Sequence, residues 1–130
     1  MKKILLIDND RSLADKLDFE YKDSIEWIPR YNAASVTVQD QKQHFDFVLL
    51  DLVLDEKAEP LVPDGLLLVP TLEQLFVKVP IILITGHELN DELKTYLRKA
   101  YGFEAIISKP FDGNSPNNGR FGRLLNNEES

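Results

Sequence analysis

Residues 47–51 read FVLLD, four apolar residues in succession closed by an aspartate. An unbroken apolar run of this length is typical of a strand that is buried on both faces, because a half-exposed strand alternates. The same pattern recurs on either side, in ILLID at 4–8 and VPIILITG at 79–86. The run AIISKP at 105–110 and a weaker run, Ile25–Ile28, supply two more candidates. The sequence therefore predicts five strands of a parallel sheet covered by helices.

Segments with helical spacing separate these runs. Leu13, Leu17 and Tyr21 recur about one turn apart, and Asp10 or Ser12 stands where a capping residue belongs. Strands that alternate with helices indicate an α/β doubly wound domain.

Three further helices are predicted along the chain. Residues 33–43 form a short, poor helical pattern, and residues 66–76 form a better one in which Pro70 predicts a kink. The helix that opens with Asn90-Asp91-Glu92 is the clearest, and Gly102 is its expected end.

The last part of the chain gives a weaker pattern. Residues 112–119, DGNSPNNG, predict a loop by composition, and residues 126–130 form an acidic tail. Phe121, Leu124 and Leu125 have helical spacing, but Gly122 interrupts them, so the last helix is expected to be short or degraded.

Composition narrows the function classes. The 130 residues fit one domain, and a net charge of −7 argues against binding to nucleic acid or anionic membranes. The absence of cysteine and the presence of only two histidines argue against thiol chemistry and against a zinc site. No apolar stretch is long enough for a signal peptide or a membrane helix, so the expected location is the cytoplasm.

Polar side chains close the strong strands. Asp8, Asp51, Thr85 and Lys109 each follow an apolar run, and the carboxyl ends of parallel strands share the edge of the sheet at which ligands bind. Clustered carboxylates recruit a cation such as Mg²⁺, and one of them can act as a nucleophile toward a phosphoryl group. A hydroxyl and an ammonium group would neutralise or bond the transferred oxygens.

These residues resemble the receiver domain of two-component response regulators, over nearly the whole chain. The matching motifs are KKILLIDND at 2–10, HFDFVLLDLVL at 44–54, PDG at 63–65, VPIILITG at 79–86 and ISKPF at 107–111. The resemblance implies a flavodoxin-like, five-stranded parallel sheet of order 2-1-3-4-5 with five helices.

The resemblance also implies roles for individual residues. Asp51 matches the phosphoacceptor, Thr85 the switch hydroxyl, and Lys109 the lysine that pairs with the phosphoryl group, followed by a proline that is often cis. The implied Mg²⁺ ligands are Asp8, Asn9, Asp51 and the backbone carbonyl of Val53. The implied partners are a histidine kinase or phosphotransferase protein and a downstream protein, with homodimer formation left open.

Four features depart from the family pattern. Asn9 replaces an acidic residue, which predicts weaker metal binding unless Asp10 compensates through water. Ile106 replaces the usual aromatic residue of the last strand, and residues 55–63, DEKAEPLVP, lengthen the loop after Asp51. The insertion would shield the site, contact a partner, or simply be a tolerated extension. The degraded last helix puts the family's output face in doubt.

Three functions follow from this reading. The first is a stand-alone receiver phosphorylated on Asp51, which catalyses its own phosphorylation and dephosphorylation and signals by protein contact or phosphorelay. The second is an interaction module with the same fold and no phosphorylation. The third is a haloacid-dehalogenase-type phosphatase with Asp8 as nucleophile and Asp10 as acid, although Asp51 would then be unexplained.

Overall fold

The computed structural model describes residues 1–55 and 63–126. Its centre is one sheet in which every neighbouring pair of strands is parallel. The strand order, β2-β1-β3-β4-β5, confirms the doubly wound α/β fold and the order 2-1-3-4-5. The strands are β1 (Lys2–Ile7), β2 (Ile25–Arg30), β3 (Phe47–Asp51), β4 (Ile81–Thr85) and β5 (Ala105–Ser108).

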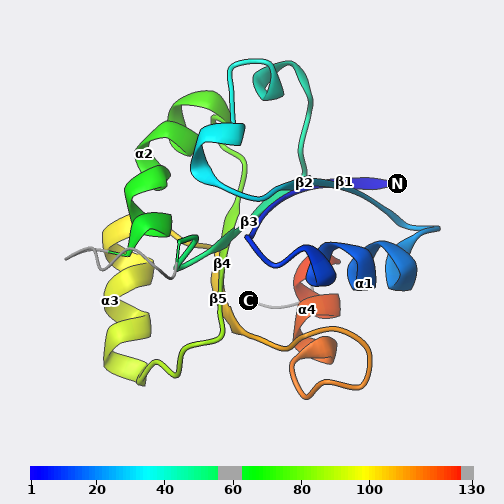
Figure 1. Cartoon of the computed structure of the whole chain (residues 1–130). Helices are drawn as coiled ribbons and strands as arrows, with labels where there is room; N and C mark the ends of the chain where they lie inside the picture. Colours follow the sequence, from blue (N-terminus) through cyan, green and yellow to red (C-terminus); the bar gives the residue numbers. More distant parts are fainter. Residues whose placement is uncertain (56–62, 127–130) are drawn as a thin grey trace.

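Helices cover both faces of the sheet. Figure 1 shows α1 and α4 on one side and α2 and α3 on the other. Right-handed crossovers between parallel strands produce this arrangement. The helices are α1 (Arg11–Tyr21), α2 (Asp64–Leu75), α3 (Asp91–Tyr101) and α4 (Asn118–Leu125). In the described part of the chain, no helix combines the length and the apolar character needed to cross a bilayer.

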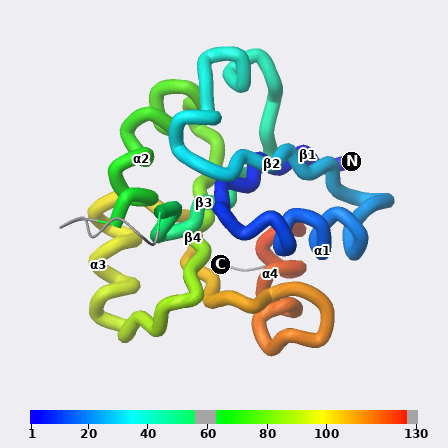
Figure 2. The backbone as a smooth tube through the Cα atoms, in the orientation of Figure 1, coloured from blue at the N-terminus to red at the C-terminus, as the bar shows by residue number. Residues whose placement is uncertain are grey.

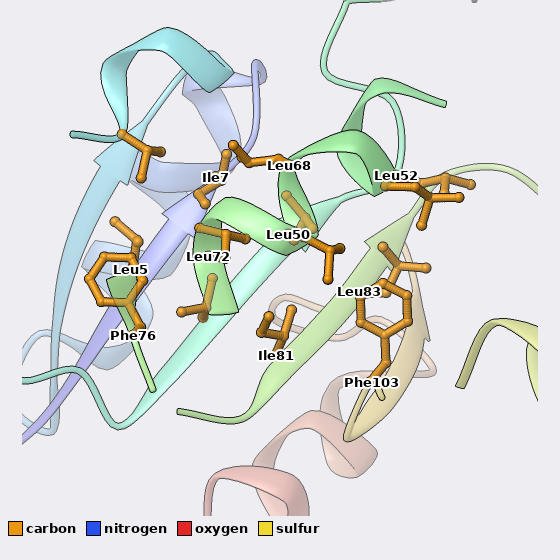
Figure 3. Packing of buried hydrophobic residues seen from close by; sticks show 14 of the residues in the cluster. Leu5, Ile7, Leu50, Leu52, Leu68, Leu72, Phe76, Ile81, Leu83 and Phe103 are labelled. Carbon is orange, nitrogen blue, oxygen red and sulfur yellow. The ribbon is translucent and has the colours of Figure 1, made fainter. Parts of the chain in front are cut away.

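The unbroken apolar runs are explained by the two cores. Successive residues of a strand point to opposite faces: Leu50 packs in the core under α2, where Figure 3 shows it beside Leu72, whereas Leu49 packs in the core under α1 and α4. Both residues are fully buried. A sheet with helices on both faces therefore needs an apolar residue at every position of its central strands.

Local signals place the helix ends as expected. Asp10 caps α1 by accepting a hydrogen bond from the Ser12 amide, and Asn90 caps α3. The end of α3 at Gly102 is confirmed, since that residue has a φ of 73°, in the left-handed region. Helix α2 continues through Pro70 to Leu75.

The connection from β2 to β3 contradicts the expected helix over residues 33–43. Two short 3₁₀ helices, Ala33–Ser35 and Asp40–Lys42, replace it, and Figure 2 shows this connection as an irregular path beside α2. The buried Asp40 carboxylate accepts hydrogen bonds from the Arg30 guanidinium and from the Thr37 amide. These bonds tie the connection to Arg30 at the end of β2. The chain thus has four α-helices within the described residues, not five.

Two boundaries also differ from expectation. Strand β2 extends through Pro29 to Arg30 because it is an edge strand, where a missing amide proton is tolerated. Helix α4 is short, as predicted, but it begins at Asn118, so the loop that opens at Asp112 ends two residues early. Most of the insertion and of the acidic tail, residues 56–62 and 127–130, lies outside the described residues.

Candidate functional site

A lysine joins two buried carboxylates at the carboxyl edge of the sheet. The Lys109 ammonium lies 2.7 Å from Asp8 Oδ2 and 3.3 Å from Asp51 Oδ2. Asp8 is only 2% exposed and Asp51 only 5%. Asp51 ends β3, Asp8 follows β1, and Lys109 follows β5. Three strand ends that are remote in sequence meet because parallel strands present their carboxyl ends on one side.

The charges of this cluster are not balanced. Burial, with a further contribution from the charge of Asp8, raises the pKa of Asp51 to about 7, although Lys109 offsets part of the effect. Burial by itself would lower the pKa of Lys109, but the two carboxylates raise it on balance. The lysine therefore stays protonated, and a second cation would be stabilised beside the carboxylates.

The donor set suits Mg²⁺. The Asp8 carboxylate uses its second oxygen, Oδ1, to accept a hydrogen bond from the Asp10 amide at 2.9 Å, which fixes its orientation. Asn9, which is exposed, directly follows Asp8 in the sequence, and Val53, which is half-buried, lies two residues after Asp51. These two residues offer an amide oxygen and a backbone carbonyl oxygen as neutral ligands. Among residues 1–55 and 63–126, no three Asp, Glu, His or Cys side chains gather as a metal site. A cation here would thus rely on neutral oxygens and water, as Mg²⁺ commonly does.

Asp10 caps the start of α1 through one oxygen of its carboxylate, Oδ1. Its carboxylate accepts hydrogen bonds from both the amide and the hydroxyl of Ser12, and the hydroxyl bond is the main cause of its lowered pKa. Both bonds end on Oδ1, so the role of this oxygen is to cap the first turn of α1.

Thr85 is fully buried. It ends β4, the strand between β3, which ends at Asp51, and β5, which precedes Lys109. Its carbonyl accepts a hydrogen bond from the Lys109 amide at 2.8 Å, which ties the ends of β4 and β5 together. Its hydroxyl oxygen accepts a bond from the His87 amide at 3.0 Å. His87 itself is exposed. The peptide bond between Lys109 and Pro110 is cis.

Ile106 takes no part in the polar cluster. It is 2% exposed and packs in the core under α2 and α3. Its carbonyl accepts a hydrogen bond from the Arg120 guanidinium of α4 at 2.8 Å. Ile106 is thus a close-packed residue of the core.

Sequence reasoning missed two residues that support the site, Asp64 and Gly65. A Cβ atom on Gly65 would lie 2.1 Å from the Asp51 carbonyl oxygen, so only glycine allows α2 to start against the end of β3. The Asp64 carboxylate accepts hydrogen bonds from the amides of Leu54 and Asp55. The motif PDG was visible, but its contacts depend on how the chain returns after the insertion.

Comparisons with known proteins identify the family. The sequence model of the response regulator receiver domain family matches residues 4–115, and the chain belongs to this family. A two-component response regulator from Clostridium difficile superposes with a TM-score of 0.74 at 20% identity, with full coverage of both chains.

Two more solved structures share the fold. The chemotaxis protein CheY4 of Vibrio cholerae gives a TM-score of 0.71 at 22% identity and covers 97% of this chain and 98% of its own. A response regulator from Burkholderia pseudomallei, which holds a phosphorylated aspartic acid, a calcium ion and citrate, gives 0.67 at 20% identity. That match covers 98% of this chain and 69% of the other.

Proposed function

We propose that this receiver domain accepts a phosphoryl group on Asp51 from a histidine kinase or phosphotransferase protein, in a reaction that depends on Mg²⁺. One observation carries the proposal: Lys109 bridges the buried carboxylates of Asp8 and Asp51 at the carboxyl edge of the sheet. The phosphorylated aspartate and calcium ion of the Burkholderia pseudomallei protein support it by family likeness. We further propose that residues 1–130 form one such domain.

The chemistry follows from the positions of these groups. An Asp51 oxygen attacks the phosphorus, the bond from phosphorus to the donor nitrogen breaks, and the histidine of the donor leaves with that electron pair. Lys109, held 3.3 Å from the attacking carboxylate, neutralises charge on the transferred group. No general base is needed once Asp51 is ionised.

Asp8, Asp51, Asn9 and the Val53 carbonyl would hold the Mg²⁺ ion, which when bound supplies positive charge to the transferred oxygens. Thr85, at the end of β4, would donate a hydrogen bond from its hydroxyl group to a phosphoryl oxygen. The hydroxyl can do so while it accepts from the His87 amide, because it has one proton and two lone pairs.

The test is the mass of the intact protein after incubation with acetyl phosphate, with and without Mg²⁺. We expect one added phosphoryl group with Mg²⁺, and none in Asp51→Asn. Asp18→Asn, which alters an exposed carboxylate on α1, is the matched control and should be modified like the parent. Equal modification of Asp51→Asn would overturn the assignment of the phosphoacceptor.

A second candidate is an interaction module that is not phosphorylated. The exposed Asn9 and the buried Ile106 favour it, because they replace an acidic ligand and an aromatic residue of the family pattern. This candidate requires that a downstream protein bind the parent and Asp51→Asn equally well. We propose a cytoplasmic location and protein partners for either candidate; self-association is to be measured with and without acetyl phosphate.

A further inference from the structure

Asp64 makes an unusual pair of contacts across the base of the insertion. It is the first residue of α2, yet its carboxylate reaches back to the segment that follows β3. Oδ1 accepts a hydrogen bond from the Leu54 amide at 2.7 Å, and Oδ2 accepts one from the Asp55 amide at 2.9 Å. Bonds between a carboxylate and amides are charge-assisted and about twice as strong as neutral ones.

The Leu54 amide belongs to the same peptide unit as the Val53 carbonyl. That peptide bond is trans, since the only cis bond within the described residues precedes Pro110. In a planar trans peptide the N–H and C=O groups point in opposite directions. A carboxylate that fixes the direction of the Leu54 N–H therefore also fixes the direction of the Val53 oxygen, on the side away from Asp64.

We propose that Asp64 is a positioning residue of the cation site, which aims and polarises the Val53 carbonyl oxygen. The inference rests on the proposed function, in which that oxygen is a Mg²⁺ ligand. The bond to Asp64 draws electron density along the peptide toward the carbonyl oxygen, which strengthens it as a ligand.

Further contacts hold the backbone around Val53 in place. The Gly65 amide donates a hydrogen bond to the Leu52 carbonyl at 3.0 Å, and a Cβ atom on Gly65 would lie 2.1 Å from the backbone carbonyl oxygen of Asp51. The start of α2 is therefore fastened to residues 51–55 at several successive backbone groups. The insertion leaves and rejoins the fold at two residues that are hydrogen-bonded to each other, Asp55 and Asp64. Its extra length does not by itself loosen the Val53 carbonyl.

The experiment is a Mg²⁺ titration of the full chain, followed by the ¹³C shift of the Val53 carbonyl and the ¹⁵N shift of the Leu54 amide. Asp64→Asn loses the charge and one of the two accepting oxygens. We expect the midpoint of its titration to rise about tenfold or more, as for other groups that orient a metal ligand, and its Leu54 shift to differ before Mg²⁺ is added. Asp91→Asn, the matching first residue of α3, should keep the midpoint of the parent.

The outcomes separate the two proposals. A parent protein whose Val53 carbonyl does not respond to Mg²⁺ overturns the metal site of the proposed function and this inference with it. A parent that responds, with Asp64→Asn at the same midpoint, overturns only the role of Asp64. Should Asp64→Asn fail to fold, Asp64→Ser, whose hydroxyl can accept one of the bonds, is titrated instead, and an unchanged midpoint counts against the inference in the same way.

Discussion

Replacing Asp51 by asparagine should stabilise the metal-free protein, and the gain should grow with pH. Burial and the charge of Asp8 raise the pKa of Asp51 from its ordinary 3.8 to about 7. Between these two values the unfolded chain has released the proton while the folded chain still holds it. Stability is therefore lost as the pH rises from about 4 to about 7, and the loss stays constant at higher pH.

The size of the effect follows from the shift. Each pKa unit corresponds to about 1.4 kcal/mol, so ionising the buried Asp51 costs the fold at most about 4 kcal/mol above pH 7. The substitution also removes the 3.3 Å contact with Lys109. Because Lys109 keeps Asp8 at 2.7 Å, it is not left unpaired. We expect a net gain of about 1–3 kcal/mol at about pH 8, and little gain at about pH 4.

Urea unfolding of the parent and of Asp51→Asn in EDTA, at about pH 4 and about pH 8, measures both gains. Asp18→Asn, on the exposed side of α1, serves as the control and should show no such pH-dependent gain. Millimolar Mg²⁺ should recover stability for the parent at the higher pH and not for Asp51→Asn. A variant that is less stable than the parent at pH 8, or equally stabilised at both pH values, would refute the reasoning.

Three smaller changes test the scaffold by the same urea assay. Asp40→Ala should cost about 2–4 kcal/mol, because it leaves the Arg30 guanidinium and the Thr37 amide without their acceptor; a loss below about 0.5 kcal/mol would contradict that role. Asn90→Ala should cost about 1 kcal/mol by removing the cap of α3, and Asn90→Asp should restore it. Lys78→Gly should gain about 0.5–1 kcal/mol, since Lys78 has a φ of 66°, a conformation that glycine adopts without steric cost; a loss of stability would show that its side chain stabilises the turn instead.

The fold was largely readable from the order of residues because its signals are local or periodic. A run such as FVLLD at 47–51 reports burial on both faces without reference to any other segment. The caps Asp10 and Asn90, with the stop at Gly102, act within one turn of the chain. Residues 33–43 escaped this reasoning because the contact that holds them, between Arg30 and the buried Asp40, joins side chains ten residues apart.

The sequence predicted which residues form the candidate site but not how their side chains are arranged. Asp8, Asp51 and Lys109 stood out because each closes an apolar run, and parallel strands bring such ends together. Whether a neighbouring carboxylate joins this cluster depends on the direction of its side chain and on its hydrogen-bond partners. Asp10 turns to Ser12, whereas Asp64, on the far side of an insertion, turns back to the amide of Leu54.

The sequence by itself determined the layered sheet and which polar groups would lie at the carboxyl edge of its strands, since apolar periodicity and strand direction are properties of single segments. Only the tertiary structure decided how those groups are charged, which carboxylate caps a helix and which one holds a backbone carbonyl. Those outcomes depend on desolvation and on hydrogen bonds between segments far apart in the chain, and both exist only once the chain has folded.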